Sequence, residues 1–183
     1  MKNVLILHGT GNNSQGNWFP WLKKELERRG YKVWVPDLPD ADYPNTKKYL
    51  KHIFSNWQFD EDSIVVGHSS GAVAILGFLQ NLPENVVIKK AILVSAFKDN
   101  LSWDALNGLF EEPFNWEKIK AHAKRVVLYH SDNDPYVPLS HAQYLKEKLD
   151  AELLVKKGQG HFNLEVGPQY KQFPELLEKI LED

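Results

Sequence analysis

The sequence predicts an α/β protein in which a doubly wound, mostly parallel sheet of about six strands forms a single domain over residues 1–183. Short runs of β-branched and aliphatic residues alternate along the chain with segments whose apolar residues recur at helical spacing. Within each run the apolar residues are consecutive, which is typical of parallel strands that helices cover on both faces. Hydrophobic residues make up 43% of the chain, enough to fill one core.

Six runs are predicted to be strands. They are Val4–Leu7, Val33–Val35, Ser63–Val66, Ala91–Val94, Arg125–Tyr129 and Leu153–Val155. Ligands of such sheets bind where loops leave the carboxyl ends of the strands. We therefore expect the functional residues in the loops that follow these runs.

Helical patterns occupy the intervals between the strands. The predicted helices are marked by Trp18, Trp21, Leu22 and Leu26 before Gly30, by Tyr49 to Trp57, by Ser70 to Leu79, and by the residues that follow Pro138 and Pro174. The segment 70–79 is apolar on all sides, which predicts a central, buried helix.

The composition excludes several classes of protein. A net charge of −2 leaves no basic surface for nucleic acid. The absence of cysteine removes a thiol nucleophile, a cysteine-ligated zinc site and a disulfide framework, and it fits a reducing cytosol. The longest apolar run, at 71–79, is too short to span a membrane, and we find no signal-peptide pattern. We expect a cytoplasmic protein with no nucleic-acid and no membrane partner.

The strongest motif is G-H-S-S-G at residues 67–71. A G-x-S-x-G match arises by chance in about one chain in twenty of this length, but this one lies between a predicted strand and the predicted buried helix. That context is typical of a nucleophile elbow, in which a tight turn flanked by glycines lifts a serine hydroxyl above the sheet. Ser69 is therefore the predicted nucleophile, and a helix start without chemistry is the alternative.

A serine hydroxyl needs a base, and elbows of this kind are followed along the chain by an acid and then a histidine. His161 follows the last predicted strand and is the predicted base. The acid is expected after the preceding strand, where Asp132 and Asp134 are both candidates. We favour Asp134 and interpret Asp132 as a turn residue that accepts backbone N–H groups. Spacing alone does not decide between them, and both could simply shape the turn.

An oxyanion hole requires backbone N–H donors beside the nucleophile. One donor is predicted at Ser70, directly after Ser69. The second is predicted at Thr10, in the loop after the first strand, with Gly11 as the alternative. His8 is interpreted as ordering that loop rather than as a general base.

Five motifs in order resemble one family. Residues 6–9, 17–26, 67–72, 134–138 and 160–162 resemble the short serine hydrolases that include retinoblastoma-binding protein nine and the bacterial YdeN-like proteins. The resemblance implies a compact α/β-hydrolase fold with a minimal lid or none, and a catalytic triad on Ser69, Asp134 and His161. It thereby supports Asp134 over Asp132. Because this chain has no cysteine, it lacks the L-x-C-x-E motif of the retinoblastoma-binding member, and we expect no such partner.

The expected reaction is hydrolysis of a small ester or related acyl substrate through an acyl-enzyme, with no cofactor and no metal. Alternatives are peptide or amide cleavage by the same residues, or a binding protein on a hydrolase scaffold. A dinucleotide site at 9–14 is disfavoured because Ser14 replaces the third glycine of that motif. A calcium loop that starts at Asp132 is disfavoured, because its required glycine and glutamate would fall on Val137 and Gln143. A magnesium-dependent phosphatase that uses Asp132 and Asp134 is a further alternative.

The segment 97–122 departs from the regular alternation and is rich in aromatic residues. Its large apolar residues are Trp103, Leu106, Leu109, Phe110, Phe114 and Trp116, with acidic residues between them. Two interpretations stay open: a helix that packs its apolar face on the sheet, or a short cap whose aromatic side chains line a substrate pocket.

Overall fold

The computed structural model describes residues 2–182 and contains a six-stranded sheet in the order β2-β1-β3-β4-β5-β6, with every neighbouring pair parallel. The strands are β1 (Asn3–Leu7), β2 (Lys32–Trp34), β3 (Ser63–His68), β4 (Lys90–Val94), β5 (Val126–Ser131) and β6 (Glu152–Lys156). The predicted fold class and all six predicted strands are confirmed, with strand ends shifted by one or two residues.

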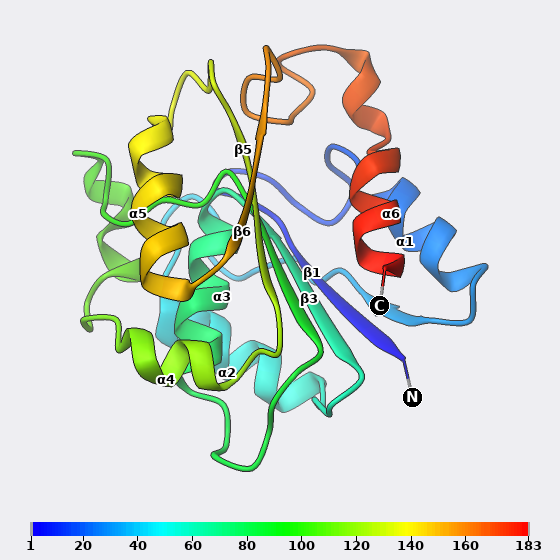
Figure 1. Ribbon diagram of the computed structural model, residues 1–183, viewed down its shortest axis with the longest axis vertical. Helices are drawn as coiled ribbons and strands as arrows, with labels where there is room; N and C mark the ends of the chain where they lie inside the picture. Colours follow the sequence, from blue (N-terminus) through cyan, green and yellow to red (C-terminus); the bar gives the residue numbers. More distant parts are fainter. Residues whose placement is uncertain (1, 183) are drawn as a thin grey trace.

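Helices cover both faces of the sheet (Figure 1). The first and last helices, α1 (Phe19–Glu27) and α6 (Pro174–Leu181), lie together on one face. The other face carries α2 (Thr46–Asn56), α3 (Ser70–Gln80), α4 (Trp116–Ala121) and α5 (Leu139–Leu149). Two short 3₁₀ helices, η1 (Asp104–Leu109) and η2 (Pro168–Lys171), complete the regular structure of the described residues.

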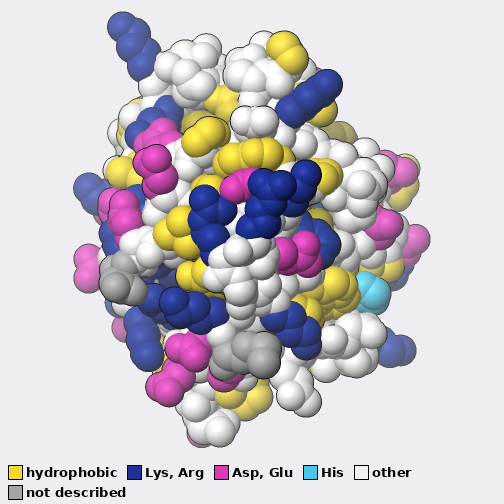
Figure 2. Space-filling model, turned by 90° about the vertical axis from the view of Figure 1, so that its right-hand side faces the viewer, with side chains coloured by type: hydrophobic (Ala, Val, Ile, Leu, Met, Phe, Trp, Pro, Cys, Tyr) yellow, Lys and Arg dark blue, Asp and Glu magenta, His cyan; other side chains and the backbone are white. Residues whose placement is uncertain are grey.

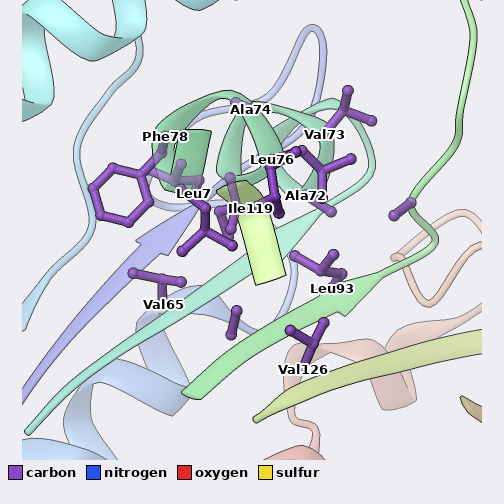
Figure 3. Packing of buried hydrophobic residues seen from close by; sticks show 14 of the residues in the cluster. Leu7, Val65, Ala72, Val73, Ala74, Leu76, Phe78, Leu93, Ile119 and Val126 are labelled. Atoms are coloured by element: carbon purple, nitrogen blue, oxygen red, sulfur yellow. The ribbon is translucent and has the colours of Figure 1, made fainter. Parts of the chain in front are cut away.

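Side chains of the strands alternate between two cores, one beneath each layer of helices. Figure 3 shows the larger core, where Leu7, Val65 and Leu93 of the strands meet Leu76 and Phe78 of α3. Every residue of α3 from Ser70 to Leu79 is buried, which confirms the central helix predicted from its all-round apolar sequence. The helix beside β3 is therefore fixed on all sides.

The order of the strands places a topological switch point between β1 and β3. The chain proceeds from β1 to the neighbouring β2 on one side, and from β3 to β4 on the other. The loops that leave the carboxyl ends of β1 and β3 thus diverge and leave room for a ligand between them.

The segment 97–122 folds into η1 and α4 rather than into one continuous helix. Its later aromatic residues form a chain of ring contacts: Phe110 with Phe114 at 5.8 Å, Phe114 with Trp116 at 5.2 Å, and Trp116 with Tyr144 of α5 at 5.9 Å between centroids. These rings pack against the larger core, as the interpretation of a packed segment requires.

The face that carries α1 and α6 mixes basic and acidic side chains (Figure 2). Ion pairs connect several of them, including Arg28 with Glu25 at 2.9 Å and Lys179 with Glu182 at 2.8 Å. This face therefore presents no extended field of one sign. Across residues 2–182, each helix is too short or too polar to cross a lipid bilayer.

Replacement of Leu76 by alanine is expected to lower the free energy of unfolding by about 2–5 kcal/mol, because the side chain is fully buried and its removal leaves a cavity beneath α3. Leu181→Ala serves as the control, because that side chain is 37% exposed. Urea denaturation of both variants measures the difference; equal losses would contradict the proposed packing of α3.

Candidate active site

Ser69 occupies a strained turn between β3 and α3. Its backbone angles are φ 56° and ψ −124°, a region that costs a non-glycine residue about 1–3 kcal/mol. Its N–H donates to the Val94 carbonyl at 2.8 Å, and its own carbonyl accepts from Ala72 at 2.9 Å and Val73 at 3.2 Å. These bonds to β4 and to the first turn of α3 hold the serine in the conformation that an elbow requires.

The glycines that flank Ser69 are required by the close approach of backbone segments. A Cβ on Gly67 would lie 2.6 Å from the backbone of Ala72, and one on Gly71 would lie 2.4 Å from the carbonyl oxygen of His8. Neither backbone can move away without displacing β1 or α3. Gly67 is therefore required by the first turn of α3, and Gly71 by the contact of α3 with the end of β1 and the loop after it.

Asp134 and His161 form a hydrogen-bonded pair. His161 Nδ1 lies 2.8 Å from Oδ2 and 3.0 Å from Oδ1 of Asp134. Because a carboxylate only accepts, the imidazole hydrogen of the neutral ring resides on Nδ1 and leaves Nε2 as a proton acceptor. Between the two candidate acids, the structure pairs Asp134 with the histidine.

The Asp134 side chain is fully buried yet richly hydrogen-bonded. Its Oδ1 accepts from the backbone N–H groups of Tyr136 and Val137, both at 3.0 Å, and its Oδ2 accepts from Ser95 Oγ at 2.8 Å. Burial alone would raise the pKa of Asp134. The bond and charge of His161 and the two backbone donors outweigh burial, so the pKa of Asp134 lies below its ordinary value.

Ser69 and His161 line the same cavity, of about 570 Å³, at the carboxyl edge of the sheet. Loops after β1, β3, β4, β5 and β6 all contribute to its wall. The hydrogen bonds within residues 2–182 include none from Ser69 Oγ to His161. Such bonds often tighten only when a substrate is bound, and the two side chains face a common space.

The loop after β1 packs directly beside Ser69. A Cβ on Gly9 would lie 3.0 Å from Ser69 Cβ, and Thr10 Oγ1 donates to Ser70 Oγ at 2.8 Å. The Gly11 N–H is engaged, because it donates to the Ala41 carbonyl at 3.0 Å. The structure thus brings Thr10 and Ser70 together, whereas the alternative donor Gly11 is already committed to another partner.

His8 fixes that loop from beneath. Its Nδ1 donates to the Gly9 carbonyl at 2.9 Å, and its Nε2 accepts from the Leu38 N–H at 2.9 Å. Burial is the main reason that the pKa of His8 lies below its ordinary value, so the ring is neutral. These bonds match the ordering role predicted for His8.

His68, which precedes the nucleophile candidate, connects the elbow to the loop that carries His161. Its Nε2 donates to the His161 carbonyl at 2.7 Å, and the two rings lie 4.9 Å apart. Burial, reinforced by the neighbouring His161, lowers the pKa of His68 to about 3. No role was predicted for His68, because a hydrogen bond between distant loops leaves no local pattern in the sequence.

The loop before His161 is held by side chains that follow β5. Asp132 Oδ1 accepts from the Gly158 N–H at 2.8 Å, and Asn133 Oδ1 accepts from the Gly160 N–H at 2.8 Å. Asp132 thus accepts a backbone N–H, but from the loop after β6 and not from its own turn, where the prediction had placed its partner. Asn133 and Ser95 were not predicted; their only signal is their position directly after a strand, which many residues without function share.

The start of the segment 97–122 contributes apolar side chains to the cavity. Phe97, Leu101, Trp103 and Leu106 line it. The aromatic residues from Phe110 onward pack on the core instead. The first part of this segment therefore lines the cavity, and its later part packs on the core. No cluster of metal-ligating side chains occurs within residues 2–182.

A parallel sheet with a serine at a strained strand–helix turn, faced by a histidine–aspartate pair, defines the α/β-hydrolase class. The serine hydrolase family model matches residues 4–182. The chain belongs to this serine hydrolase family.

Individual relatives agree with this assignment. The chain is 30% identical to the serine hydrolase RBBP9 of Rattus norvegicus over 176 residues, which cover 94% of the chain and 89% of the relative. It is 34% identical to the putative hydrolase YdeN of Bacillus subtilis over 164 residues, covering 88% and 86%. The crystal structure of the B. subtilis ydeN product superimposes with a TM-score of 0.90 and 31% identity, covering 98% of this chain and 97% of that one.

Loss of the Asn133 acceptor is expected to loosen the loop that carries His161. In Asn133→Leu, the Gly160 N–H loses its partner, so hydrogen–deuterium exchange at 158–162 is expected to accelerate about fivefold, as loss of a bond worth about 1 kcal/mol implies. Asn133→Asp keeps the acceptor and is the matched control. Unchanged exchange in the leucine variant would contradict the proposed anchor.

The lowered pKa of Asp134 predicts a contribution to acid stability. Its carboxylate stabilises the folded state above the ordinary value of about pH 4, and this contribution is lost as pH falls through the lower pKa of the folded protein. Between about pH 4 and pH 2, the wild type is therefore expected to lose more stability than Asp134→Asn. Urea midpoints across this range test the difference, and parallel losses would refute it.

Proposed function

We propose that this protein hydrolyses small esters with apolar acyl groups through an acyl-enzyme on Ser69, with His161 as base and Asp134 as its orienting partner. The observation that carries the proposal is the hydrogen bond between Asp134 and His161 Nδ1 at 2.8 Å, which leaves Nε2 of His161 able to accept a proton. The imidazole ring of His161 lines the same cavity as the strained Ser69. Membership of the serine hydrolase family supports it.

In the proposed first half-reaction, His161 Nε2 takes the hydroxyl proton of Ser69 as Oγ bonds to the carbonyl carbon of the ester. The tetrahedral intermediate then collapses, the bond to the alcohol oxygen breaks, and His161 gives its proton to the leaving alcohol. In the second half, water attacks the acyl-enzyme with His161 again as base, which releases the acid and restores the Ser69 hydroxyl. Asp134 remains ionised throughout.

The negative charge on the carbonyl oxygen is proposed to be stabilised by the backbone N–H groups of Thr10 and Ser70. The side-chain bond between Thr10 and Ser70 at 2.8 Å supports this, since it fixes the two residues beside each other. Ser70 is also the first residue of α3, whose N-terminal dipole favours negative charge.

The apolar part of the cavity supports an apolar acyl group. Phe97, Leu101 and Leu106, whose side chains are hydrocarbon, line the cavity, and Val137 joins them from the loop after β5. A cavity of about 570 Å³ is large enough for a small acyl chain together with an alcohol. Cleavage of amides by the same residues is the second candidate, since a serine–histidine–aspartate triad also cleaves amide bonds.

Treatment with a fluorophosphonate probe tests the proposed nucleophile. The wild type is expected to be labelled on Ser69, Ser69→Ala to be unlabelled, and Asp134→Ala to react roughly 10³-fold or more slowly because His161 loses its orienting partner. Asp132→Ala is the matched control, because Asp132 contacts Gly158 and not His161. Ester hydrolysis is expected to follow the same order and to survive a chelator.

Folded wild-type protein that resists the probe and cleaves no ester would overturn the proposal and favour a binding role. Equal labelling of the Asp134→Ala and Asp132→Ala variants would instead reject Asp134 as the functional acid. Circular dichroism of each variant confirms that the fold is intact.

A further inference from the structure

The geometry points to a preferred substrate whose leaving group carries a positive charge, recognised by Glu165 together with the ring of Tyr136. This inference rests on the proposed ester hydrolysis and adds the chemical class of the leaving group, such as an amino alcohol or a quaternary ammonium alcohol.

The cavity wall carries negative charge. Among the described residues that line the cavity, Glu165 is the only aspartate, glutamate, lysine or arginine. A second carboxylate lies beside the lining residue Gly11: Asp42 Oδ1 would be 3.5 Å from a Cβ on that glycine. The wall therefore attracts cations and repels anions.

Glu165 lies on the side of the cavity where the leaving group is expected, and not on the side of the acyl group. In the proposed reaction His161 protonates the leaving oxygen, so the leaving group must lie beside the His161 ring. The Tyr136 ring contacts that imidazole edge-to-face, with centroids 5.0 Å apart. The Tyr136 hydroxyl in turn donates to Glu165 Oε2. A leaving group on His161 thus meets first an aromatic ring and then a carboxylate.

Tyr136 and Glu165 are both accessible to such a group. Half of the Tyr136 side chain is exposed, at 51%, so its ring is available for contact with a cation. The bond to Glu165 is the main cause that raises the pKa of Tyr136 above its ordinary value, so the hydroxyl stays protonated and continues to donate. A carboxylate has further acceptor sites, so this bond leaves Glu165 able to pair with a cation.

Two butyrate esters that differ only in charge test the inference. One is the ester of choline; the other is its tert-butyl isostere, in which carbon replaces the ammonium nitrogen. In the wild type we expect kcat/KM for the cationic ester to exceed that for the neutral one roughly fivefold, which is typical of a partly exposed cation site. The preference is expected to shrink as salt is added.

Variants assign the preference to its residue. Glu165→Gln is expected to reduce the ratio of the two kcat/KM values to about one, and Glu165→Lys to reverse it below one, as a coulombic origin requires. Glu147→Gln changes the net charge equally from the exposed surface of α5 and is expected to keep the wild-type ratio. Because the readout is a ratio, a general loss of activity does not imitate the effect.

The outcomes separate this inference from the proposed function. Hydrolysis of both esters at equal rates, or a ratio that Glu165→Gln leaves unchanged, overturns the inference while the esterase activity stands. No hydrolysis of either ester and no probe labelling of Ser69 overturn the proposed function and this inference with it. A ratio that falls in both Glu165→Gln and Glu147→Gln would assign the preference to net charge and also reject the inference.

Discussion

The backbone contact between α3 and the loop after β1 is the constraint on which the site depends. At Gly71 the two segments approach so closely that a Cβ would lie 2.4 Å from the His8 carbonyl oxygen. This approach accompanies the contact of Thr10 with Ser70, directly after the strained turn at Ser69. The fully buried α3 supplies the rigidity that sustains this strain, because neither the core nor the sheet can yield.

The other half of the site is assembled by bonds between loops that are distant in sequence. His68 binds the backbone of His161 from the elbow, and Asn133 binds Gly160 from the loop after β5. Ser95, after β4, holds Asp134. None of these contacts involves the atoms proposed to react; each fixes a backbone group or the carboxylate of Asp134. The position of His161 therefore depends on the loops at the ends of β3, β4, β5 and β6 together.

The sequence was sufficient to predict the strands, because strands buried on both faces appear as uninterrupted apolar runs. Chain order pointed to Ser69 and His161 but left Asp132 and Asp134 both open. The family resemblance favoured Asp134, which is the carboxylate that the structure pairs with His161. The sequence was insufficient for η1 and α4, which are short and depend on contacts with α3 and with neighbouring rings rather than on a periodic pattern of their own. His68 and Asn133 were missed for a related reason: their roles exist only once separate loops meet.

The two strands at the borders of the sheet bear on how the protein behaves at high concentration. β2 has only three residues, and Lys32 at its start lies over the Trp57 ring at 4.5 Å. β6, at the opposite border, begins with Glu152 and ends with Lys156, both in ion pairs. A strand of three residues offers few free hydrogen-bonding groups, and charged side chains at the ends of a strand disfavour pairing with another chain. Both borders of the sheet therefore carry features that disfavour edge-to-edge pairing with another chain at high concentration.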